Sequence, residues 1–146
     1  MVPRSRRVAF RARAIVIDLA YFPKASAILY RLIELGAEVN HRASTGLTAV
    51  EETIWGGSNH GLSTLPELKL LLEQGGDPTV IGSTGAPLLQ LALEYNRLEH
   101  AKLLLEHGAN PAQPSPDFRP ETAFAVAKRL GNKAALDLLN QFKELA

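Results

Sequence analysis

Leucine-rich segments recur along the chain, and each ends in a glycine. Three such segments align with one another, and their glycines are Gly36, Gly75 and Gly108, which lie 39 and 33 residues apart. The apolar positions before each glycine follow helical spacing. A glycine just after the last turn supplies the left-handed conformation in which many helices end. The pattern therefore predicts three leucine-rich helices that end at these glycines.

A new helix start follows each of these glycines at a nearly constant distance. Thr48, Pro87 and Thr122 come twelve, twelve and fourteen residues after the preceding glycine. Threonine suits the N-cap of a helix, and proline suits the first turn, where its missing N–H costs nothing. Each period thus predicts a small-residue helix followed by a leucine-rich one. A helix pair of this size cannot bury its apolar face alone, so neighbouring pairs must stack.

The same spacing extends to both ends of the chain. Working back from the first glycine predicts a degenerate first pair, with helices at 15–22 and 25–35. The last helix should end near Phe142 and is polar along one side, as a terminal helix of a stack must be. We expect residues 1–14 to form a basic arm or helix extension and residues 15–146 to form one repeat domain.

The repeated marks resemble the ankyrin-repeat family, whose unit of about 33 residues is a turn followed by two antiparallel helices. The family pattern is kept in the following segments: Gly46-x-Thr48, Leu71-Leu72, Gly75-Gly76-Asp77 and Leu104-Leu105-x-x-Gly108-Ala109-Asn110. The resemblance covers about residues 15 to 142. It implies an all-α ankyrin-repeat solenoid of about four stacked helix-turn-helix units with β-hairpin-like finger loops. It also implies a protein-binding module, such as an adaptor, an inhibitor or an immunity-type protein.

The chain departs from the family pattern in three places. The Thr-Pro-Leu-His tetrapeptide is degenerate, for example Pro87-Leu88-Leu89-Gln90, so other donors must replace its histidine. Residues 57–63 form an insertion of small polar residues, which we expect to be mobile. After it, residues 64–67 (Thr-Leu-Pro-Glu) fit a capping box. Residues 111–120 carry four prolines and predict a stiff, extended finger.

Composition narrows the possible functions. The chain has no cysteine and a formal net charge of +1, but the basic charge is uneven. Five arginines lie within residues 1–13, and the remainder holds 11 basic against 15 acidic residues. This arm could contact phosphate, so a nucleic-acid-associated protein is the alternative reading, although an acidic body disfavours it. Apolar runs are too short for a membrane span or a secretory signal, so we expect a cytoplasmic protein. We also expect it to be a monomer that binds another protein.

No residue pattern points to catalysis, a cofactor or a metal. His100 and His107 lie seven residues apart on one predicted helix, about 10 Å by helical rise, which is too far to share a metal ion. We expect both to be solvated. The neighbouring carboxylates Glu51 and Glu52 point in different directions on a helix and suit its positive N-terminal end. The remaining histidines, His41 and His60, fall in predicted loops without an obvious partner.

The resemblance also indicates where a partner would bind, namely on the finger loops and the concave side of the first helices. The finger candidates are Arg42, Ser44, Thr45, Leu47, Ile81, Ser83, Thr84, Ala86, Asp117, Phe118 and Arg119. The concave candidates are Phe22, Trp55, Tyr95 and Arg129. Aromatic residues and arginine are typical of binding hot spots. The alternative for Trp55 and Tyr95 is that they pack between repeats.

Overall fold

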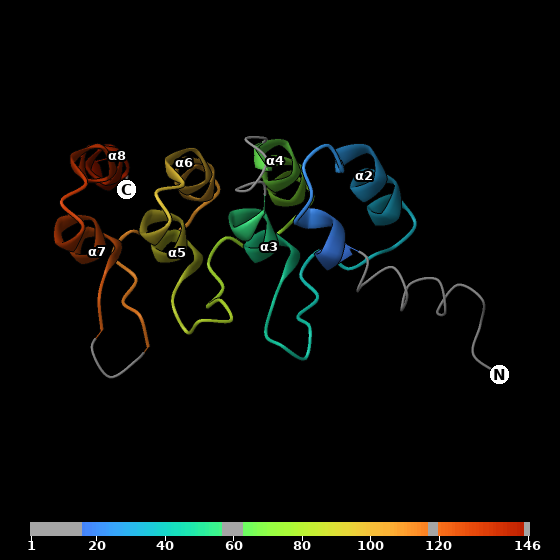
Figure 1. The fold of residues 1–146 in the computed structure, drawn as a ribbon, viewed down its shortest axis with the longest axis horizontal. Coiled ribbons are helices and arrows are strands. Elements are labelled where there is room, and N and C mark those ends of the chain that lie inside the picture. Colours follow the sequence, from blue (N-terminus) through green and yellow to red (C-terminus); the bar gives the residue numbers. More distant parts are fainter. Residues whose placement is uncertain (1–15, 57–62, 117–119, 145–146) are drawn as a thin grey trace. The chain divides into compact units, whose positions relative to one another are not determined.

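A computed structural model describes residues 16–56, 63–116 and 120–144, and the chain forms two compact units, Met1–Asp77 and Pro78–Ala146. Unit 1 holds helical residues 16–20 and the helices α2 (Ser26–Glu34), α3 (Ala49–Trp55) and α4 (Leu65–Glu73). Unit 2 holds α5 (Leu88–Glu94), α6 (Leu98–Glu106), α7 (Ala123–Arg129) and α8 (Lys133–Glu144) (Figure 1). The described residues contain no strand beyond one isolated bridge, between Ile81 and Pro87, so the predicted all-α class is confirmed.

Helix pairs stack within each unit, as the repeat pattern requires. In unit 2, α5 packs against α6 and α7 against α8, while α5 also packs on α7 and α6 on α8 (Figure 1). In unit 1, α3 packs against α4, which also contacts α2. Leucines fill the spaces between these helices, including Leu29, Leu68 and Leu71 in unit 1 and Leu88, Leu93, Leu104 and Leu139 in unit 2. None of the described helices is both long and apolar enough to cross a membrane.

The helix starts predicted at Thr48 and Thr122 and the ends predicted at the glycines are confirmed. The hydroxyl of Thr48 accepts a hydrogen bond from the Glu51 N–H, and that of Thr122 accepts one from the Ala125 N–H, both at 3.3 Å. Positive φ angles are found at Gly36, Gly75, Gly108 and Gly131 (95°, 94°, 103° and 64°). Pro87 is the residue before α5 rather than part of its first turn. The first helix is shorter than predicted, because Tyr21 and Phe22 already form a turn.

A finger loop closed by a backbone hydrogen bond precedes three of the helix pairs, α3–α4, α5–α6 and α7–α8. The bonds run from Ala43 N–H to Leu47 O (2.9 Å), from Gly82 N–H to Ala86 O (2.8 Å) and from Ser115 N–H to Glu121 O (2.8 Å). These bonds confirm the hairpin-like fingers. The basic arm at 1–14, most of the insertion (57–62) and the tip of the proline-rich finger (117–119) lie outside the described residues.

The predicted capping box at the start of α4 is wrong. The hydroxyl of Thr64 donates to the carbonyl of Thr53 at 2.5 Å instead of accepting a bond from its own helix. The Oγ of Ser63 accepts from the Leu65 N–H at 3.0 Å. Glu67 does not turn back to Thr64, because its carboxylate reaches a different helix.

Glu67 caps α2 from α4. Its side chain is fully buried, and its Oε1 accepts hydrogen bonds from the Ala25 N–H (2.8 Å) and the Ser26 hydroxyl (3.1 Å). Ala25 is the N-cap residue of α2 and has no side-chain oxygen that could accept a hydrogen bond from the start of the helix. A carboxylate is favourable beside the N–H groups that a helix leaves unpaired at its start. Glu67 therefore joins two segments about 42 residues apart.

We predict that Glu67→Ala lowers the free energy of unfolding by about 2–4 kcal/mol, since it leaves a buried N–H without its acceptor and opens space in unit 1. Glu67→Gln keeps an acceptor oxygen and should cost less, about 1 kcal/mol. Urea denaturation measures both. Glu73→Ala, on the exposed end of α4, is the control and should change stability by less than about 0.5 kcal/mol. Equal midpoints for Glu67→Ala and Glu73→Ala would contradict the capping role.

Candidate functional site

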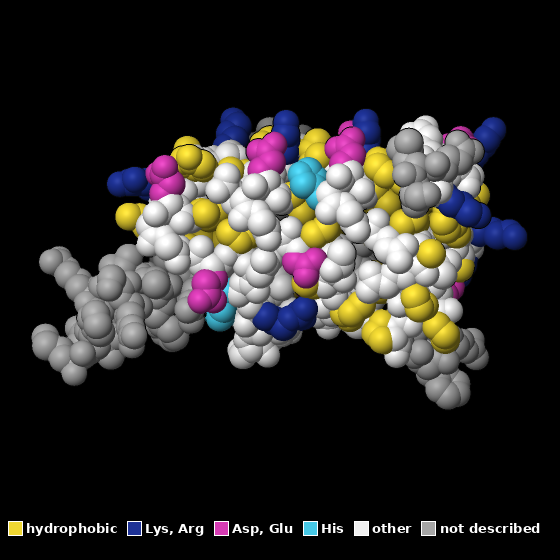
Figure 2. Space-filling view, turned by 180° about the vertical axis from the view of Figure 1, so that it is seen from behind, with side chains coloured by type: hydrophobic (Ala, Val, Ile, Leu, Met, Phe, Trp, Pro, Cys, Tyr) yellow, Lys and Arg dark blue, Asp and Glu magenta, His cyan; other side chains and the backbone are white. Residues whose placement is uncertain are grey.

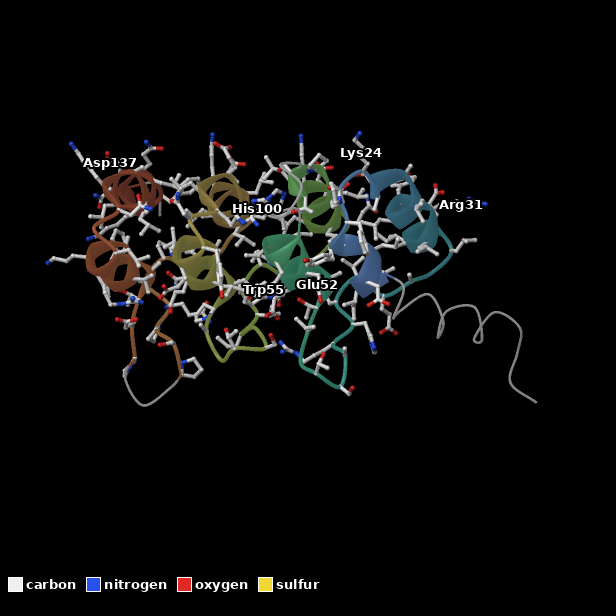
Figure 3. The ribbon with its side chains drawn as sticks, viewed as in Figure 1. Lys24, Arg31, Glu52, Trp55, His100 and Asp137 are labelled. Atoms are coloured by element: carbon white, nitrogen blue, oxygen red, sulfur yellow. The ribbon has the colours of Figure 1, made fainter. Side chains whose placement is uncertain are left out.

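The structure describes three of the four histidines, and His60 lies outside the described residues. His100 is buried on α6, with 4% of its surface exposed (Figure 3), so its expected solvation is wrong. It lies on the buried side of α6, together with Ala101, Leu104 and Leu105. His107 is exposed, and its Nδ1 lies 2.9 Å from the carbonyl of Leu103. In the described part of the chain, no three His, Asp or Glu side chains lie close enough together to hold a metal ion.

The two carboxylates of α3 occupy different environments. Glu51 is fully buried, and its Oε1 accepts a hydrogen bond from the indole N–H of Trp55 at 3.3 Å. Glu52 is half-buried, and partial burial raises its pKa above the usual value, with smaller contributions from the charges of Glu51 and Asp18. Figure 3 shows Glu52 and Trp55 on the side of α3 that faces its finger loop.

The candidate residues of unit 1 remain spread over its finger and its first helices. Phe22 is 57% exposed, whereas Trp55 is half-buried and bonded to Glu51. Arg42 donates to the carbonyl of Gly46 at 2.8 Å and so braces the finger. The remaining finger candidates are Ser44 and Thr45, which are exposed, and Leu47, which is half-buried.

In unit 2, several candidates meet at one groove with a volume of about 520 Å³. Its lining residues are Thr84, Ala86, Gln90, Leu91, Glu94, Tyr95, Ser115 and Glu121. Three of these residues (Gln90, Leu91 and Glu94) belong to α5, and four belong to the second and third finger loops. Tyr95 ends α5 and is 55% exposed. We call this the α5 groove; its volume lies within the range of about 300–1,000 Å³ typical of ligand sites.

Arg129 joins two carboxylates of the α5 groove. Its guanidinium donates to Glu121 through Nε and Nη2, at 3.2 and 3.3 Å, and to Glu94 through Nη2. The hydrogen bond to Glu94 and, to a smaller extent, those to Glu121 raise the pKa of Arg129 above its ordinary value. All three side chains are partly exposed, between 37% and 47%. The triad therefore ties α7 to α5 and to the third finger while remaining accessible to solvent.

Gln90 holds the third finger against α5. Its side chain is 4% exposed, and its amide group donates to the carbonyls of Gln113 (3.2 Å) and Glu121 (2.6 Å). These carbonyls lie on the two arms of the finger. The Oγ of Ser115 accepts the N–H of Glu121 at 3.0 Å and closes the same stem. The buried side-chain amide of Gln90 thus holds in place the part of the third finger that carries Glu121.

The structure brings together only part of the predicted surface. Thr84, Ala86 and Tyr95 line the α5 groove, and Arg129 bonds to its edge. Ile81 is half-buried and Ser83 is exposed on the second finger. Three further finger candidates, Asp117, Phe118 and Arg119, lie outside the described residues. The sequence reasoning missed Glu94 and Glu121, because neither position matches a mark of the repeat.

Comparison with known families agrees with this geometry. A family model described as the ankyrin repeat matches residues 84–115, which span the second finger, α5, α6 and the start of the third finger. Residues 84–115 therefore form an ankyrin repeat. No curated protein matches it.

Within the ankyrin repeat, Gln90 stands where the family's tetrapeptide usually has histidine. The sequence required another donor at this position, and the Gln90 amide provides it with two hydrogen bonds across the turn. Asn96 plays a comparable part at the turn between α5 and α6. It adopts a positive φ of 54°, and its Oδ1 accepts a hydrogen bond from the Asn132 amide at 3.0 Å.

Gln90→Leu should destabilise unit 2 by about 1–3 kcal/mol, because it leaves two carbonyls of the third finger without their donor. Hydrogen exchange at the Glu121 amide should become faster, since the finger stem loosens. Gln113→Ala is the matched control. Only the backbone of Gln113 takes part, so this variant should stay within about 0.5 kcal/mol of the wild type. An unfolding midpoint shared by the two variants would refute this role of Gln90.

The raised pKa of Glu52 predicts a pH-dependent effect. Ionised Glu52 is less favourable in the folded than in the unfolded chain, so its contribution to stability is present at low pH and is lost as the pH rises through its folded pKa. Glu52→Gln should therefore raise Tm relative to the wild type at pH 7 and lose this advantage near pH 3. The exposed Glu73→Gln should show no such difference. A Tm gain independent of pH would contradict the electrostatic cause.

Proposed function

We propose that this ankyrin-repeat chain binds a partner protein through its finger loops and the α5 groove, as an adaptor, an inhibitor or an immunity-type protein. Ankyrin repeats are general protein-interaction modules. The α5 groove carries the proposal, since it combines a concave surface, an exposed tyrosine and hydrogen-bonding groups held in place by Gln90 and Arg129. Such fixed side chains lose little entropy on binding and so suit an interface.

The surface of the described residues fits a protein partner better than a nucleic acid. On the face seen in Figure 2, Lys and Arg side chains are interspersed with Asp and Glu. The α5 groove itself carries two carboxylates and one guanidinium. Phosphate binding requires a surface dominated by positive charge. A nucleic-acid role would therefore depend on the arginine-rich residues 1–13, which are outside the described part.

Salt dependence separates these two functions. The full chain should retain one protein from extracts of its source, with only a modest loss of binding between about 50 and 500 mM salt. Binding through phosphate contacts would instead weaken steeply over this range. Retention of nucleic acid alone, with affinity lost at high salt, would refute the proposed function.

Tyr95→Ala should weaken binding of the retained protein by about thirtyfold, or about 2 kcal/mol, the usual scale of an aromatic hot spot. The unfolding midpoint should change little, because more than half of the Tyr95 side chain is exposed. Tyr30→Ala is the control, since Tyr30 is similarly exposed (46%) but lies on α2 in unit 1. Calorimetry of the purified pair measures both. Equal effects of the two substitutions would remove the α5 groove from the interface.

A further inference from the structure

The charges in the α5 groove do not cancel. Glu94 and Glu121 each contribute a negative charge, and Arg129 is the cation hydrogen-bonded to both. The triad therefore carries a formal charge of −1 in a concave surface. Lys133 lines a separate, smaller groove that also touches Glu94, and does not line this one. A concave surface of this charge attracts a cation more than an anion.

We infer that the α5 groove receives an arginine side chain from the protein partner, a conclusion that rests on the proposed function and specifies its chemistry. The incoming guanidinium pairs with Glu94 and Glu121 and lies over Tyr95. Each carboxylate has about four lone-pair sites, more than the bonds that Arg129 makes, so a second cation can bind beside Arg129 or take its place.

Two features favour arginine over lysine. A guanidinium can bind a carboxylate through two parallel hydrogen bonds, which the point charge of an ammonium cannot do. It also stacks on an aromatic face, and Tyr95, which is exposed, lines the groove together with its neighbour Glu94. The third finger already binds a guanidinium through two hydrogen bonds, because Glu121 accepts both from Arg129.

Arg129 consequently acts as an internal competitor. It occupies the carboxylates when no partner is bound and lowers the net negative charge of the groove by one. Its removal should strengthen the binding of a cation and weaken that of an anion. This opposite response makes Arg129 the most informative position to change.

The test uses the full chain and three capped pentapeptides, acetyl-Ala-Ala-X-Ala-Ala-amide, in which X is arginine, its uncharged analogue citrulline, or glutamate. Titrations followed by NMR should show the arginine peptide binding at millimolar concentration, with shifts centred on the amides of Tyr95 and Glu94. The citrulline and glutamate peptides should bind at least about tenfold more weakly.

Charge variants then examine the mechanism. Arg129→Gln should tighten binding of the arginine peptide by about three- to tenfold, whereas Glu94→Gln and Glu121→Gln should weaken it by a similar factor. Lys102→Gln removes an equal charge from the exposed face of α6 and should have little effect. Circular dichroism and unfolding midpoints establish that each variant is folded. If Glu121→Gln loosens the finger, Glu94→Gln and Arg129→Gln still decide the matter.

Three results would overturn the inference: no shift at the α5 groove up to about 10 mM arginine peptide, equal binding of the citrulline peptide, or weaker binding to Arg129→Gln. Its failure is distinguishable from that of the proposed function. A partner whose binding depends on Tyr95 but not on Glu94 or Arg129 would leave the protein-binding function standing and remove only the arginine. Loss of all protein retention would remove the function itself.

Discussion

The burial of leucine between short helices is the interaction on which the rest of this structure depends. The helices α2 to α7 are seven to nine residues long, and α8 has twelve residues. Helices of that length are marginal in water, so tertiary packing must supply their stability. A buried leucine contributes about 1.5–3 kcal/mol. Because this packing is repeated from pair to pair, the outward-facing positions and the finger loops are left to vary with function.

This division explains how much of the molecule the sequence could predict. Helix ends depend on neighbouring residues, so Thr48, Thr122 and the glycines with positive φ could be identified directly. Glu67 followed the local rule for a capping box, yet its carboxylate binds the start of α2, about 42 residues away. A local motif cannot distinguish these two partners. Their choice depends on the packing of α2 against α4, which brings Ala25 within reach.

The candidate site shows the same limit more strongly. Tyr95 and Arg129 could be selected because aromatic residues and arginine at their repeat positions are typical of interfaces. Glu94 ends a helix and Glu121 belongs to a finger loop, 27 residues further along. They can be recognised as parts of one site only once the guanidinium of Arg129 is seen to bind both. Gln90 was visible as a departure from the family tetrapeptide. Its two acceptors, 23 and 31 residues further along, could not be identified without the folded finger.

The Arg129 triad links stability to recognition in unit 2. Exposed ion pairs contribute little to stability, so the triad adds little to helices held together by leucine. Its larger effect is to keep Glu94 and Glu121 in fixed positions at the edge of the α5 groove. The interaction that positions the carboxylates also occupies them, so the arginine that we infer would bind beside Arg129 or replace it. Replacement would exchange one guanidinium contact for another, and the leucine packing beneath would remain unchanged.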